Sequence, residues 1–143
     1  AAKEKVDVLI NDKEIKGLRV VGPVRKETQI ELSMTDAVSL GVLPPLRISG
    51  DLEGSLSAVL TGPKGKVKID RGVIIAKRHI HCSEKEAKEL GVENNQSVCI
   101  DINTGDRELV FRDIKIRVNK DYKLCVHLDT DEGNASGIDK IGE

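Results

Sequence analysis

Two histidines placed two positions apart form the first candidate site in this sequence. His79 and His81 lie in the segment from Arg78 to Ser83, with Ile80 between them. Residues two apart in an extended strand point to the same face, so the two imidazoles should lie side by side while Ile80 turns into the core. Neutral imidazoles are good ligands for zinc and similar ions. The spacing therefore indicates one half of a metal site.

The third histidine of the chain, His127, lies in a second segment of alternating character. Cys125 and His127 should share one face of a strand there, so we expect His127 to complete the site from that strand. Cys82 should point away from the face of His79 and His81, so it is not expected to be a ligand. The alternative is that three histidines in a domain of this size are unrelated surface or core residues. Spacing alone leaves both interpretations open.

The composition sets limits on the fold and on the function. The chain has 143 residues, a net charge of −1, no Trp, one Phe and one Tyr, so its core must rest on Val, Ile, Leu and Ala, which favours strands. A balanced charge with few aromatic residues argues against a nucleic-acid partner. No apolar run approaches the length of a membrane span. Three cysteines without paired spacing do not indicate a disulfide framework and favour the cytoplasm.

The sequence pattern predicts many short strands and two short helices. Both helices carry the same start and stop signals, a serine before the helix and a glycine after it, at Ser33 with Gly41 and at Ser83 with Gly91. The tail at 129–137 is acidic and rich in small residues. It either orients the metal ligands through hydrogen bonds, together with Asn134, or is only a solvated turn. The predicted strands are 6–10, 15–21, 28–32, 46–48, 57–61, 67–69, 73–76, 97–102, 108–111, 114–118 and 124–128.

The two helical segments are copies of one pattern, 50 positions apart. Such a period indicates duplicated supersecondary units. We therefore predict a mainly β fold of two small β-barrel domains related by an internal repeat, each with a short capped helix, at 1–72 and 73–143. The offset also places Glu31 where the second copy has His81, so Glu31 is either a metal ligand or the polar face of a strand. The matching residues are Ser33, Ala37, Leu40, Gly41 and Val42 with Ser83, Ala87, Leu90, Gly91 and Val92.

Five motifs, in order along the whole chain, carry a resemblance to a known family. On them the chain resembles the phosphate propanoyltransferases of the propanediol-utilisation type, which are phosphotransacylases. The motifs are Gly22-Pro23-Val24-Arg25 with Thr28-Gln29 and Glu31, Ser49-Gly50-Asp51-Leu52 with Gly54, Gly62-Pro63-Lys64-Gly65, Arg78-His79-Ile80-His81, and His127 with Asp129-Thr130-Asp131-Glu132 and Asn134-Ala135.

The resemblance implies a fold of two β-barrels and a site with two zinc ions in the complete protein. It implies reversible transfer of an acyl group, propionyl or acetyl, between coenzyme A and phosphate, with acyl phosphate as the other partner. Arg25 and Glu31 are then the catalytic residues, and Arg25 binds the phosphate. Arg78 is a further candidate for binding phosphate or coenzyme A. The implied metal ligands are His79, His81 and His127 for one zinc and Glu31 for the other.

One departure from the family pattern bears on activity. The family has a further Arg-His-x-His segment near its N-terminus, and this chain has none, so we expect the first barrel to lack strands and one zinc to lack most of its ligands. The chain alone is then either active or an inactive fragment. The expected location is the cytoplasm or a bacterial microcompartment. The microcompartment shell and a second copy of the chain are candidate partners. The alternatives are a small zinc-binding β-barrel module without turnover and a plain interaction domain.

Overall fold

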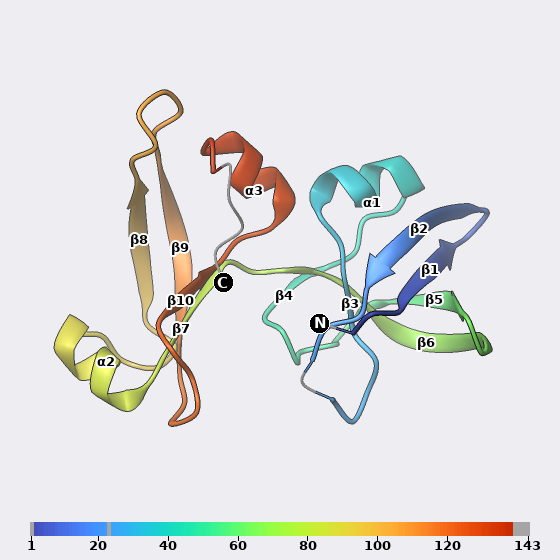
Figure 1. Cartoon of the computed structure of the whole chain (residues 1–143), viewed down its shortest axis with the longest axis horizontal. Helices are drawn as coiled ribbons and strands as arrows, with labels where there is room; N and C mark the ends of the chain where they lie inside the picture. The colour runs from blue at the N-terminus through green and yellow to red at the C-terminus, as the bar shows by residue number, and fades with distance from the viewer. Residues whose placement is uncertain (1, 23, 139–143) are drawn as a thin grey trace. The chain divides into compact units, whose positions relative to one another are not determined.

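The protein is described by a computed structural model that covers residues 2–22 and 24–138. The chain forms two compact units, Ala1–Ala76 and Lys77–Glu143 (Figure 1). The boundary expected after residue 72 falls inside the last strand of the first unit. Whether each unit is a barrel domain stays a prediction.

The first unit is built on a six-stranded sheet. Its strands follow the order β2-β1-β5-β6-β3, and β4 also pairs with β6. The neighbours β2, β1, β5 and β6 are antiparallel, whereas β3 and β4 run parallel to β6. The elements are β1 (Lys5–Ile10), β2 (Lys13–Arg19), β3 (Ile30–Glu31), α1 (Met34–Leu40), β4 (Leu46–Arg47), β5 (Leu56–Gly62) and β6 (Gly65–Ala76).

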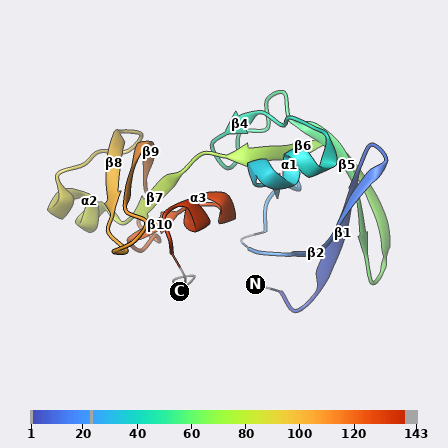
Figure 2. The same ribbon diagram turned by 90° about the horizontal axis from the view of Figure 1, so that it is seen from above.

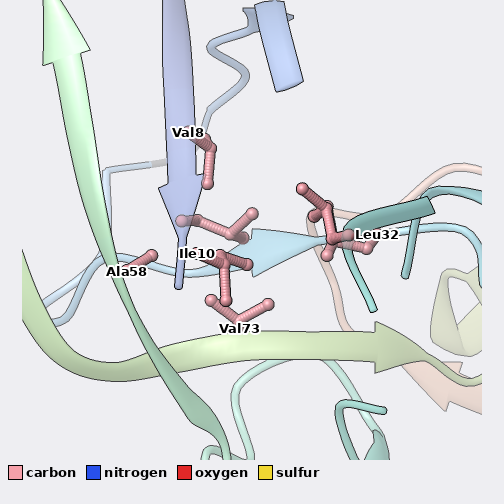
Figure 3. Packing of buried hydrophobic residues seen from close by; sticks show 7 residues of the cluster. Val8, Ile10, Leu32, Ala58 and Val73 are labelled. Atoms are coloured by element: carbon pink, nitrogen blue, oxygen red, sulfur yellow. The ribbon is translucent and has the colours of Figure 1, made fainter. Parts of the chain in front are cut away.

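Aliphatic side chains from the strands and from helix α1 form the core of this unit. Val8 and Ile10 lie on one face of β1 because strand residues two apart share a face. They pack with Leu32, Ala58 and Val73, and all five side chains are buried (Figure 3). The core therefore rests on aliphatic residues, as the composition predicted.

The second unit is built on a four-stranded sheet in the order β10-β7-β9-β8. The central strands β7 and β9 are parallel, and the outer strands pair antiparallel with them. Ile80, Cys82, Ala87, Ile114 and Ile116 form its buried core. The elements are β7 (His79–Cys82), α2 (Glu84–Leu90), β8 (Ser97–Ile102), β9 (Leu109–Val118), β10 (Cys125–His127) and α3 (Thr130–Ala135) (Figure 2).

The predicted helix signals are confirmed at both repeated helices. The hydroxyl of Ser33 accepts a hydrogen bond from the backbone N–H of Asp36, and Ser83 forms a reciprocal capping box with Glu86. Gly41 and Gly91 end the helices in the left-handed conformation, at φ 69° and 67°. Glycine suits this conformation because it has no Cβ.

Three segments differ from the sequence-based prediction. The strands expected at 67–69 and 73–76 are one strand, β6, and those expected at 108–111 and 114–118 are one strand, β9. The acidic tail, expected as a turn, forms helix α3 with Asp129 as its cap.

The mainly β class is confirmed, while two closed barrels stay a prediction. The two units share an arrangement in which a strand, a helix and an antiparallel pair follow in order. The last strand then lies parallel to the first, as in β3 with β6 and in β7 with β9. Among the described residues, none of the helices combines the length and the apolar character that crossing a membrane requires.

Candidate metal centre

The three histidines meet on two neighbouring strands of the second unit. β10 pairs antiparallel with β7 so that His127 lies opposite His79 and Cys125 lies opposite His81, and the two strands run side by side in both views (Figures 1 and 2). The ring centroids of His79 and His127 are 4.5 Å apart, and the planes of the two rings are nearly parallel. The ring of His81 lies 4.7 Å from His79 and 4.4 Å from His127. The sheet register therefore brings together the residues that the alternation predicted to meet.

The spacing of the three rings suits a single metal ion. One ring nitrogen from each histidine lies within 4.8 Å of the others. Nitrogens bound to a tetrahedral zinc are separated by about 3.4 Å, because each lies about 2.1 Å from the ion. The limit of 4.8 Å exceeds this separation, so the nitrogens would have to move closer together when an ion binds. Three protein ligands leave one tetrahedral position open, which is typical of a catalytic centre and not of a structural one.

The ring of His79 is oriented by the backbone. Its Nδ1 lies 2.9 Å from the carbonyl oxygen of Lys77. A ring N–H at Nδ1 donates to that carbonyl, which leaves Nε2 with a lone pair for a metal. His79 is buried, His81 is half-buried and His127 is exposed. The donor set is thus fixed on its inner side and open on its outer side.

Tyr122 adds an aromatic contact that the sequence did not reveal. Its ring stacks on His81 with a centroid distance of 3.9 Å and an interplanar angle of 17°. Tyr122 lies in the turn between β9 and β10, where its N–H donates to the carbonyl of Asn119. The stack restricts rotation of the His81 ring. No spacing rule would have found this residue, because the contact depends on the path of the turn.

The cysteines near the histidines have different environments. Cys82 is fully buried, and burial, followed by the nearby charge of Glu86, raises the pKa of its thiol. A thiol that resists ionisation inside the core is a poor metal ligand. Cys125 is exposed opposite His81. Within the described part of the chain, the grouping of side chains suited to a metal consists of the three histidines.

Arg78 lies directly before His79, and its guanidinium forms hydrogen bonds with other residues of the second unit. Its Nη1 donates to Oε1 of Glu132 at 3.0 Å, and its Nη2 donates to the carbonyl of Arg112 at 3.2 Å. The guanidinium also lies 5.1 Å from the ring centroid of Phe111. Burial raises the pKa of Glu132, although the N–H of Asp129 and the charge of Arg78 oppose that shift. Sequence reasoning missed Glu132 as a partner of Arg78.

The predicted residues Arg25 and Glu31 lie in the first unit, within a polar network. Oε1 of Glu31 accepts hydrogen bonds from Nε2 of Gln29 at 2.6 Å and from the hydroxyl of Ser49 at 3.0 Å. Nη2 of Arg25 donates to the same hydroxyl at 3.0 Å. The side chain of Gln29 also accepts the N–H of Gly50. The side chains of Gln29 and Glu31 therefore lie within hydrogen-bond distance of each other, and Ser49 links them to Arg25.

The fold and the histidine cluster define a mainly β protein with a candidate three-histidine metal centre. The chain belongs to the phosphate propanoyltransferase family, whose model matches residues 1–139. It is 52% identical over 136 residues to a phosphate propanoyltransferase of Thermotoga maritima, an alignment that covers 95% of this chain and 65% of the relative. Relatives of the same name from Shewanella putrefaciens and Salmonella typhimurium are 45% and 41% identical, over 97% of this chain and 66% of each relative. The chain thus spans about two thirds of the length of these relatives.

Proposed function

We propose that this chain is the metal-binding part of a zinc-dependent phosphate acyltransferase. The reaction is acyl-CoA plus phosphate giving acyl phosphate plus coenzyme A, in either direction, with a propionyl or acetyl group. The observation that carries the proposal is the convergence of the three imidazoles in a chain of this family. Family membership supports the acyl transfer, and the donor set supports zinc.

In this proposal His79, His81 and His127 hold one zinc ion. A zinc ion with an open position supplies positive charge that can neutralise phosphate or carbonyl oxygen. The lone pair of His79 is already directed by the Lys77 carbonyl, so less reorganisation is needed when the ion binds. The exposure of His127 leaves the site accessible to substrate from that side.

Arg25 and Glu31 have complementary roles in the same proposal. Arg25 binds the phosphate, because a guanidinium offers a planar fork of donors to two oxygens. Glu31 serves as a ligand of a second zinc, and Gln29 and Ser49 orient its carboxylate through the hydrogen bonds described above. Arg78 is the second candidate for binding the anionic groups of coenzyme A.

The group transfer exchanges one bond to the acyl carbon for another. In one direction the coenzyme A thiolate attacks the carbonyl carbon of the acyl phosphate, a C–S bond forms, and the C–O bond to phosphate breaks. In the other direction a phosphate oxygen attacks the thioester, and the thiolate leaves. Both directions need the phosphate held in place and its charge offset, which is the role proposed for Arg25.

The proposal extends to the domain organisation, the cellular location and the partners of the protein. Each unit, Ala1–Ala76 and Lys77–Glu143, would form one of two β-barrel domains related by the repeat. The protein would act in the cytoplasm or in a bacterial microcompartment during propanediol degradation, with a second copy or a shell protein as partners. The family resemblance supports these points.

Phosphate-dependent release of free thiol from propionyl-CoA tests the activity. The assay is run on this chain and, where the gene encodes more, on its whole product, each loaded with zinc. Thiol release that requires phosphate and is lost in His81→Ala supports the proposal. Release that persists in His81→Ala contradicts the role of the histidine pair. Zinc binding without thiol release by the whole product indicates a binding module instead.

A further inference from the structure

We propose that the capping-box carboxylates Glu86 and Glu132 are positioning residues that fasten the two ends of the β7–β10 pair and so hold the three histidines in register. This inference rests on the metal site proposed above and deepens it. Neither glutamate belongs to the histidine cluster. Each caps a helix with one carboxylate oxygen, and with the other it accepts a hydrogen bond from a residue directly before a histidine-bearing strand.

β10 needs support from outside its own ladder. It has three residues, all of them exposed, and it lies at the edge of the sheet, where β7 is its neighbour. A short, exposed edge strand gains little from burial and frays easily. The ligand geometry nevertheless requires His127 to stay opposite His79. Something beyond the strand pairing must therefore fix its ends.

Glu86 fastens the end of the pair where β7 stops and β10 begins. Its Oε2 accepts hydrogen bonds from the N–H and the hydroxyl of Ser83, at 2.8 and 2.7 Å. Its Oε1 accepts the N–H of Leu124 at 3.2 Å. Ser83 directly follows β7 and Leu124 directly precedes β10. One carboxylate thus joins the two strands at this end.

Glu132 fastens the opposite end, where β7 begins and β10 stops. Its Oε2 accepts the N–H of Asp129 at 2.9 Å, and its Oε1 accepts Nη1 of Arg78 at 3.0 Å. Arg78 directly precedes His79, and Asp129 lies two residues after His127. The bond from Arg78 to the carbonyl of Arg112 extends the tie to β9. The two glutamates therefore bracket the histidine pair from both sides.

A helix cap alone does not require a carboxylate at these positions. A capping box uses one side-chain oxygen at the third helical residue, and glutamine supplies it as well as glutamate does. The second oxygen is needed only for the contact with Leu124 or Arg78. Glutamine can keep the cap, but its amide then presents N–H groups to a backbone N–H or to a guanidinium. Glu86→Gln and Glu132→Gln should therefore remove the contact with Leu124 or Arg78 and leave the helix cap in place.

Zinc affinity of the chain tests the inference, measured by competition with a chromophoric chelator and zinc alone. We expect Glu86→Gln and Glu132→Gln each to weaken zinc binding by about 10- to 100-fold, the usual effect of losing a contact that orients metal ligands. The visible absorption of bound Co²⁺ should change as well, because the ligand geometry loosens. Arg78→Lys, which keeps one donor for Glu132, should lose less affinity than Arg78→Met.

A matched control is available in the first unit. Asp36 is the third residue of α1, as Glu86 is of α2, so Asp36→Asn makes the same chemical change at the same helix position. We expect unchanged zinc affinity for this control. Affinities of both glutamine variants within about twofold of wild type, or an equal loss in Asp36→Asn, would overturn the positioning role. A wild-type chain that binds no zinc would instead overturn the metal site itself, so the two failures are distinguishable.

Discussion

Gly72 in strand β6 is a position where one added methyl group should strongly destabilise the fold. Its φ is +139°, and a Cβ there would run into the backbone carbonyl oxygen of Thr28 and approach Cδ1 of Ile69 to 3.1 Å. The backbone oxygen cannot rotate away as a flexible side chain could. Gly72→Ala must therefore displace the segment at Thr28, which leads directly into Gln29 and Glu31.

Gly65, on the same strand, provides the matched control. Its φ is +132°, close to that of Gly72, but no atom lies within 4 Å of an added Cβ. Strain at such a φ costs about 1–3 kcal/mol at either position. Overpacking adds about 1–3 kcal/mol at Gly72 alone. We therefore expect Gly72→Ala to lower the free energy of unfolding by at least about 1 kcal/mol more than Gly65→Ala does.

Urea unfolding of the two variants, followed by circular dichroism, measures this difference. The slope of the free energy against urea concentration should stay the same, so that the midpoints report stability. Equal losses in the two variants would refute the reasoning, because the contact with Thr28 would then cost nothing. A larger loss in Gly65→Ala would refute it as well.

Further predictions concern the second unit. Ile114→Ala, at a fully buried core position, should cost about 2–5 kcal/mol in urea unfolding, whereas Val110→Ala, at a residue that is 54% exposed on the same strand, should cost far less; equal costs would contradict the assigned core. Zinc at about 100 times its dissociation constant should stabilise the wild type by about 2.7 kcal/mol in thermal unfolding and leave His81→Ala unchanged, and the same shift in both proteins would contradict the ligand assignment. Hydrogen bonds from Ser83 and Leu124 hold the pKa of Glu86 below its ordinary 4.5, so the wild type should lose its stability advantage over Glu86→Gln as the pH falls below 4.5. Burial raises the pKa of Glu132, so the wild type should lose stability relative to Glu132→Gln as the pH rises above 4.5, and parallel pH profiles for the two variants would contradict these opposite shifts.

The histidine cluster could be predicted because it depends on strand alternation. A period of two places His79 and His81 on one face whatever the tertiary contacts are, and the same rule applies to His127. The helix ends were equally predictable, since serine caps and glycine stops act through local hydrogen bonds. These features need no knowledge of distant segments.

Other features depend on contacts that the sequence does not reveal. Residue Asp113, at φ 56°, interrupts the alternation of β9 without ending the strand, and Gly72 does the same in β6. Helix α3 could not be predicted from an apolar periodicity because it has no buried apolar face, although Asp129 with Glu132 is a recognisable capping box. The Arg78–Glu132 ion pair joins residues 54 positions apart, so only the fold brings them together.

The zinc content of the purified chain tests the central claim most directly. Elemental analysis after dialysis should give about one zinc per chain for the wild type, because three converging imidazoles form one site in the second unit. The same measurement on His79→Ala and His127→Ala should give little zinc, while Cys99→Ala, at an exposed cysteine outside the cluster, should match the wild type. A wild type without zinc, or histidine variants that retain it in full, would contradict the account.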